Sequence, residues 1–126
     1  MLLGKDQQLG AADLRAEVVP VPEWGGDVRI QGMMGCDRNS LLGESATSDV
    51  PRYSNWYGRV LVRCIVDEKG QRIYQDADAE ALGRKNALVL ERLFTVAARL
   101  SALAEADVEE LAKNSESTPN GGTTSA

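Results

Sequence analysis

The sequence predicts an α+β protein: a small N-terminal β-hairpin packed on a mainly α-helical domain, with a disordered C-terminal tail. A Trp-Gly-Gly turn at residues 24–26 lies between two short apolar stretches, as in a hairpin. Apolar residues recur at helical spacing over 52–66 and 84–103. Residues 114–126 are Ser-, Thr- and Gly-rich and lack an anchor for a core. One folded domain over residues 1–113 is therefore expected.

The hairpin is expected to extend over about 17–33, pairing residues 17–22 with residues 27–33. Pro20 and Pro22 remove two backbone donors, so the first strand must lie at the edge of its sheet. Trp24 at the tip either caps the small core or is exposed.

Residues 31–51 carry a weaker pattern. Asp37 is suited to N-cap a short helix that reaches Leu42. Gly43, followed by polar residues and Pro51, is expected to end this helix in a connector.

The segment 52–66 is rich in β-formers, yet its apolar residues repeat as in a half-buried helix. The apolar stripe comprises Tyr53, Trp56, Tyr57, Val60, Leu61, Cys64 and Ile65. We therefore predict a helix over 52–66. The other face of this helix carries Arg52, Asn55, Arg59 and Arg63, which we expect to face solvent.

The C-terminal third is predicted to be helical over about 77–103 and again over 106–113. Asp76 or Asp78 can cap the first turn, and Gly83 is expected to break or kink the helix soon afterwards.

The composition argues against catalysis and against nucleic-acid binding. The formal net charge is −5, whereas binding through phosphates requires clustered Lys and Arg. The chain has no histidine, which removes the commonest general base and the usual zinc ligand. Asp76-Ala-Asp78 begins like a calcium loop, but Ala81 stands where that loop needs Gly. We expect no catalytic residue, no metal and no cofactor.

The chain shows no apolar run long enough for a signal peptide or a membrane span, so we expect a cytoplasmic protein with no membrane partner. Cys36 and Cys64 are expected to be small buried hydrophobic residues rather than a disulfide.

Five segments, in this order, resemble the tail assembly chaperones of long-tailed (siphovirus-type) bacteriophages. They are Val19 to Ile30, Leu61 to Ile73, Ala79 to Lys85, Leu93 to Ser101 and Leu111 to Ser115. Residues 31–58 depart from the family pattern. Such proteins tend to carry a charged helix there, whereas this chain has two Met residues, a glycine at 43 and three aromatic residues.

The resemblance implies a non-enzymatic assembly factor in the cytoplasm of the infected bacterium. Such chaperones coat the tape measure protein, keep it soluble and help recruit the major tail tube protein, and they are absent from the mature virion. Self-association is a further expectation. Many are made in a second, longer form by a programmed frameshift, and Lys113-Asn114 permits a slippery codon pair.

Five residues are candidates for the partner-binding surface, because aromatic and Met side chains are enriched at adaptable interfaces. They are Trp24, Met33, Met34, Trp56 and Tyr57. The alternative is that Tyr53, Trp56 and Tyr57 fill the core. Two other functions stay open: a minor structural or connector component of the tail, and a DNA-binding regulatory module. The three arginines at 52, 59 and 63 are the one hint of the latter.

Overall fold

A computed structural model describes residues 1–47 and 51–103 of the chain. In chain order its elements are α1 (Lys5–Gly10), β1 (Ala16–Val21), the 3-10 helix η1 (Pro22–Trp24), β2 (Gly26–Gln31), α2 (Gly35–Thr47), α3 (Trp56–Leu61), β3 (Ile65–Val66), the 3-10 helix η2 (Asp76–Asp78), α4 (Ala79–Leu82) and α5 (Ala87–Leu100). The α+β prediction is confirmed. The predicted helix 106–113 and tail 114–126 lie outside the described residues.

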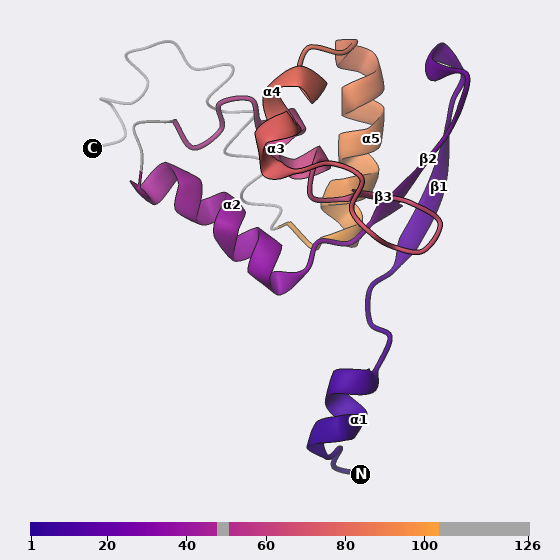
Figure 1. Cartoon of the computed structure of the whole chain (residues 1–126), viewed down its shortest axis with the longest axis vertical. Coiled ribbons are helices and arrows are strands. Elements are labelled where there is room, and N and C mark those ends of the chain that lie inside the picture. The colour runs from indigo at the N-terminus through magenta and orange to yellow at the C-terminus, as the bar shows by residue number, and fades with distance from the viewer. Residues whose placement is uncertain (48–50, 104–126) are drawn as a thin grey trace.

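The elements form a sheet on one side of the domain, α2 on the other side and the remaining helices between them, with α1 standing apart on an extended segment (Figure 1). None of the described helices is both long and apolar enough to cross a bilayer.

The sheet has the antiparallel order β1-β2-β3, so β1, which contains Pro20, lies at an edge as predicted, and Pro22 lies beyond the strand in η1. The hairpin register runs from Ala16 opposite Gln31 to Val21 opposite Gly26. The third strand, β3, was not predicted. The backbone N–H of Gln31 donates to the carbonyl oxygen of Cys64 at 2.8 Å, which extends the pairing of β2 with the β3 segment.

The core lies between one face of the sheet and the helices α3 and α5. Its largest fully buried side chains come from the sheet, from α2, α3 and α5, and from the segment between α3 and β3: Ile30, Leu41, Leu61, Leu93, Val21, Val60, Val62, Val89 and Cys64. The stripe predicted for the long C-terminal helix is therefore in the core, with Val89, Leu90, Leu93, Phe94 and Ala97 buried on α5.

The predicted helix over 52–66 is wrong at both ends. Residues 52–55 form a turn in which Asn55 has a positive φ of 48°, so α3 begins at Trp56. The helix ends after Leu61, and Ile65–Val66 become β3 because β2 offers a strand to pair with. The spacing of apolar residues wrongly predicted a continuous helix. Residues 58–66 are all buried, both in α3 and after it, so apolar residues continue past the end of the helix.

The predicted solvent-facing side of that segment is also wrong for two arginines. Arg59 and Arg63 are 6% and 2% exposed. The Glu44 carboxylate of α2 accepts hydrogen bonds from both guanidinium groups, at 2.9 and 3.0 Å. Arg63 also pairs with Asp76 at 3.2 Å. These arginines are buried because acidic residues from other elements fold over them, so Arg59 and Arg63 do not form a solvent-facing basic surface.

The predicted helix over 77–103 is divided into η2, α4 and α5. The break follows Gly83, as expected, and α5 starts only at Ala87 because the Asn86 side chain accepts hydrogen bonds from Leu88 N and Val89 N. Upstream, α2 is longer than predicted: it begins at Gly35, and Gly43 lies within it rather than at its end.

Candidate functional site

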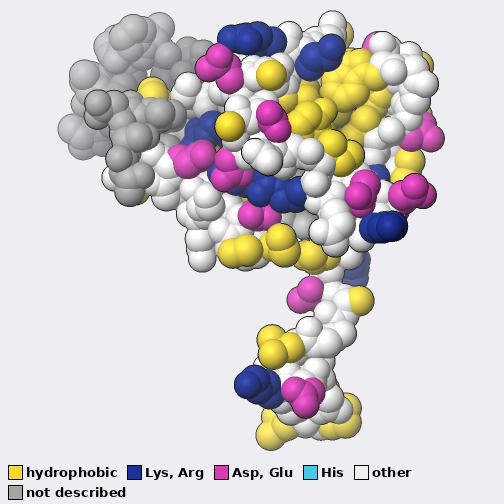
Figure 2. Space-filling model, viewed as in Figure 1, with side chains coloured by type: hydrophobic (Ala, Val, Ile, Leu, Met, Phe, Trp, Pro, Cys, Tyr) yellow, Lys and Arg dark blue, Asp and Glu magenta, His cyan; other side chains and the backbone are white. Residues whose placement is uncertain are grey.

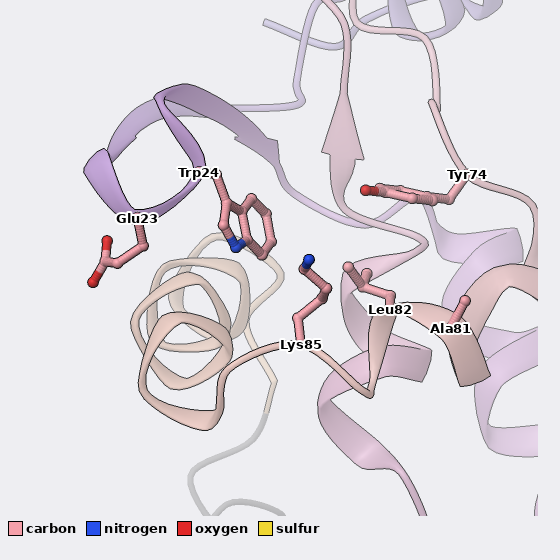
Figure 3. Close-up of a pocket in the computed structure, with 6 residues that line it drawn as sticks. All are labelled: Glu23, Trp24, Tyr74, Ala81, Leu82 and Lys85. Carbon is pink, nitrogen blue, oxygen red and sulfur yellow. The ribbon is translucent and has the colours of Figure 1, made fainter.

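A cleft of about 540 Å³ lies between the hairpin tip and the α4–α5 connection, and we call it the Trp24 cleft. It is lined by Glu23, Trp24, Tyr74, Ala81, Leu82 and Lys85. Figure 2 shows a hydrophobic surface over this region of the molecule, with a basic side chain nearby. Figure 3 shows the Trp24 ring and the Lys85 amino group pointing toward the space that Tyr74 and Leu82 border from the other side.

The hairpin tip places Trp24 at the cleft by a tight local turn. Pro22 opens η1, where its fixed φ suits the first position of a helical turn. Gly25 ends the turn with φ 80°, a conformation that glycine adopts without strain, and its N–H donates to Pro22 O at 3.0 Å. The sequence Pro-Glu-Trp-Gly therefore fixes the backbone position of Trp24 at the edge of the cleft.

An ion pair fastens the tip to α5. The Glu23 carboxylate accepts hydrogen bonds from both terminal nitrogens of Arg92, at 2.9 and 2.7 Å. These bonds lower the pKa of Glu23 to about 2, with a further contribution from its own backbone N–H. The carboxylate points away from the cleft in Figure 3, so the pair positions the hairpin tip and does not place the Glu23 charge inside the cleft.

The opposite wall combines a buried apolar residue with a cation. Leu82, at the end of α4, is buried, and Tyr74 is half-buried. Lys85 Nζ lies 5.8 Å from the centroid of the Trp24 ring, a cation–π arrangement. None of the ion pairs found within the described part of the chain involves Lys85, so its charge is available to a partner.

The arrangement of these side chains suits the binding of a partner. Aromatic and aliphatic side chains line the cleft together with the Lys85 ammonium group, a combination typical of binding surfaces. Within residues 1–47 and 51–103, no group of three or more His, Cys, Asp or Glu residues is arranged to hold a metal ion.

Comparison with known proteins identifies the family. A family model described as phage tail assembly chaperone matches residues 10–114. The chain belongs to this family. A solved structure, the tail assembly chaperone of bacteriophage HK97, shares the fold with a TM-score of 0.53 and 23% sequence identity; the match covers 79% of this chain and 95% of that one. A search of curated proteins finds no match.

In this tail assembly chaperone, the five residues predicted for partner binding do not form one surface. Trp24 lines the Trp24 cleft. Trp56 is 4% exposed and packs edge-to-face on Tyr53, with ring centroids 5.1 Å apart. Tyr57 is half-buried and its ring lies 4.7 Å from that of Phe94 on α5. The alternative that the aromatic residues at 53–57 pack into the core therefore describes these positions better.

The two candidate methionines lie in different environments. Met33 is buried, and its N–H donates to the Ser101 hydroxyl at 3.0 Å. Met34 is 43% exposed and lines a second hollow of about 330 Å³, which Leu14 and Arg72 also border.

Sequence reasoning missed Tyr74, Leu82 and Lys85 as cleft residues. Leu82 and Lys85 belong to the turn that ends α4, and Tyr74 lies upstream of it; all three are about 50 residues or more from Trp24, so no spacing links them to Trp24. One signal was available: Tyr74 is an aromatic residue in a short extended bridge, where a helix or strand core does not account for it.

Proposed function

We propose that this chain is a non-enzymatic assembly factor for phage tails. It binds the tape measure protein of its phage, keeps that protein soluble and helps recruit major tail tube subunits. It acts in the cytoplasm of the host cell, self-associates while doing so, and leaves before the virion is complete. The observation that carries this proposal is membership of the phage tail assembly chaperone family over residues 10–114.

The Trp24 cleft supplies the physical means of binding. A tape measure protein is long and mostly helical, and its apolar stripe would aggregate if left bare. A cleft of about 540 Å³ has room for apolar side chains from one face of such a helix. Trp24 and Tyr74 provide rigid aromatic contacts, which dominate binding energy at many interfaces. Lys85 at the cleft favours a helix with a carboxylate beside its apolar stripe.

Co-expression tests the function. The tape measure gene of the same phage is expressed alone and together with this chain, and the soluble fraction and the co-purified material are measured. We expect an insoluble tape measure protein alone and a soluble complex in the presence of this chain. Failure to bind or solubilise, combined with detection of this chain in purified particles by mass spectrometry, would favour a minor structural or connector component instead.

A longer product is a separate proposal. If the frameshift at Lys113-Asn114 occurs, mass spectrometry of the native gene product will show a second species that shares the N-terminal peptides.

A further inference from the structure

On the side of α2 that faces the rest of the domain, an acidic residue, a leucine and a second acidic residue form a stripe. Asp37, Leu41 and Glu44 lie at i, i+4 and i+7, which places them on one side of the helix. Leu41 is fully buried, and both carboxylates form ion pairs with the domain. Among the α2 side chains that the structure describes, Leu41 is the one fully buried residue.

The stripe is held by three arginines, Arg59, Arg63 and Arg72, which we call the arginine socket. Glu44 bridges Arg59 and Arg63 at 2.9 and 3.0 Å, and Asp37 pairs with Arg72 at 3.4 Å. Arg59 also donates to the carbonyl oxygen of Leu41, at 3.3 Å.

Asp76 of η2 links two arginines of the socket and so joins the ion pairs into one network. It lies 3.2 Å from Arg63 and 2.7 Å from Arg72, so positive and negative groups alternate from one end of α2 to the other. The socket thus holds α2 by ion pairs at two positions and by the buried Leu41 side chain between them.

The fit of α2 in this socket is incomplete. Asp37 Oδ2 and Arg63 Nε are buried and form no hydrogen bond, and unpaired buried groups of this kind are costly. The helix itself is poorly favoured, because Asn39, Ser40 and Gly43 have low helix propensity. It also stands at the side of the domain, away from the sheet (Figure 1).

We propose that the arginine socket is a second partner-binding site, which α2 occupies in the free protein. Its partner is an amphipathic helix of another protein with an acidic residue at i, an apolar residue at i+4 and an acidic residue at i+7. Such a helix takes the place of α2 and supplies the same pairs. This proposal goes beyond the proposed function and does not depend on the tape measure protein being the partner.

A designed peptide tests the exchange on the full chain. The probe is a fluorescein-labelled helical peptide of Ala, Gln and Lys that carries Glu at i and i+7 and Leu at i+4. Its control has both Glu residues replaced by Gln. Affinity is measured by fluorescence anisotropy for the wild type, for Glu44→Gln and for Glu80→Gln, whose exposed ion pair with Arg84 lies outside the socket.

Weakening the hold of α2 raises the fraction of molecules with an open socket, so Glu44→Gln should bind the peptide about tenfold more tightly than the wild type. Glu80→Gln should bind like the wild type, and the control peptide should bind none of the three. Equal or weaker binding by a folded Glu44→Gln variant would contradict the proposal.

A measurement on the wild type covers the case in which Glu44→Gln does not fold. Hydrogen exchange of the α2 amides is followed with and without excess peptide. Faster exchange in α2, with no change in α5, supports displacement; unchanged or slower exchange overturns it.

Discussion

Glu23 at the hairpin tip and Arg92 on α5 form an ion pair with two hydrogen bonds, although 69 residues separate them in the chain. One helical heptad further along α5, Arg99 donates to both oxygens of Glu17, at the start of β1. The two ion pairs therefore connect α5 to the beginning of β1 and to the hairpin tip just after β1. They hold the tip, and Trp24 with it, next to the α4–α5 connection.

The two tryptophans should respond differently to truncation. Trp24→Ala removes a half-buried ring from the cleft, so we expect lost tape measure binding and a change in unfolding free energy of about 1 kcal/mol or less. Trp56→Ala empties a core position and should cost about 3–5 kcal/mol. Urea denaturation and co-purification measure the two effects. Lost binding in a stable Trp56→Ala variant, with full binding by Trp24→Ala, would place the partner surface elsewhere.

Acid should weaken the fold through paired carboxylates. Hydrogen bonds from Arg92 lower the pKa of Glu23 from 4.5 to about 2. Burial raises the pKa of Glu44, but hydrogen bonds from Arg59 and Arg63 outweigh burial and lower it overall. A lowered pKa in the folded state contributes stability above the unfolded pKa, and this is lost as pH falls toward the folded value.

We therefore expect the urea midpoint to be constant near neutral pH and to fall as pH decreases from 4.5 toward about 2. Glu23→Gln should show a smaller fall over this window than the wild type. An identical acid dependence in the two proteins would show that the Glu23–Arg92 pair does not contribute.

Two glycines in helices predict opposite effects of the same substitution. A Cβ at Gly58 would lie 2.4 Å from the backbone oxygen of Ala79, so Gly58→Ala forces α3 and α4 apart. Overpacking of this kind typically costs about 1–3 kcal/mol. A Cβ at Gly43 meets nothing within 4 Å, and Gly43→Ala should stabilise by about 0.5–1 kcal/mol. Thermal denaturation of both variants tests the difference; a stabilising Gly58→Ala would refute the close approach of α3 and α4.

The two cysteines should differ in reactivity, since both are free thiols and one is exposed. Burial raises the pKa of Cys64 to about 11, and a hydrogen bond with Ser101 offsets only part of this effect. Cys36, which was predicted to be buried, is exposed on the first turn of α2, so the prediction holds for Cys64 only. Alkylation near pH 8 should therefore label Cys36 quickly and Cys64 only after unfolding, as peptide mass spectrometry can show. Equal labelling of the native protein would indicate that Cys64 is accessible.

Sequence patterns predicted the parts of the fold that depend on local signals. The stripe of α5 is long and regular, and the Pro20 edge strand and Gly25 turn follow from backbone chemistry. The same patterns could not show that α3 ends early, because β3 exists only through pairing with β2. They also placed Arg59 in solvent, since the acid that pairs with it comes from α2.

The candidate site was less predictable than the fold. Trp24 was named as a candidate for partner binding because an aromatic side chain at a hairpin tip can be exposed to a partner instead of packing in the core. Tyr74 and the Leu82–Lys85 turn meet Trp24 from other parts of the chain, and this convergence is a property of the tertiary structure.

Site-specific photo-crosslinking tests the central claim most directly. Benzoylphenylalanine replaces Tyr74 in the cleft or, as a control, Val18, which is 56% exposed on β1. Each variant is co-expressed with the tape measure protein and irradiated, and the products are identified by mass spectrometry. A crosslink to the tape measure protein from position 74, absent from position 18, is the predicted result. A crosslink from position 18 with none from position 74 would contradict the assignment of the Trp24 cleft as the binding site.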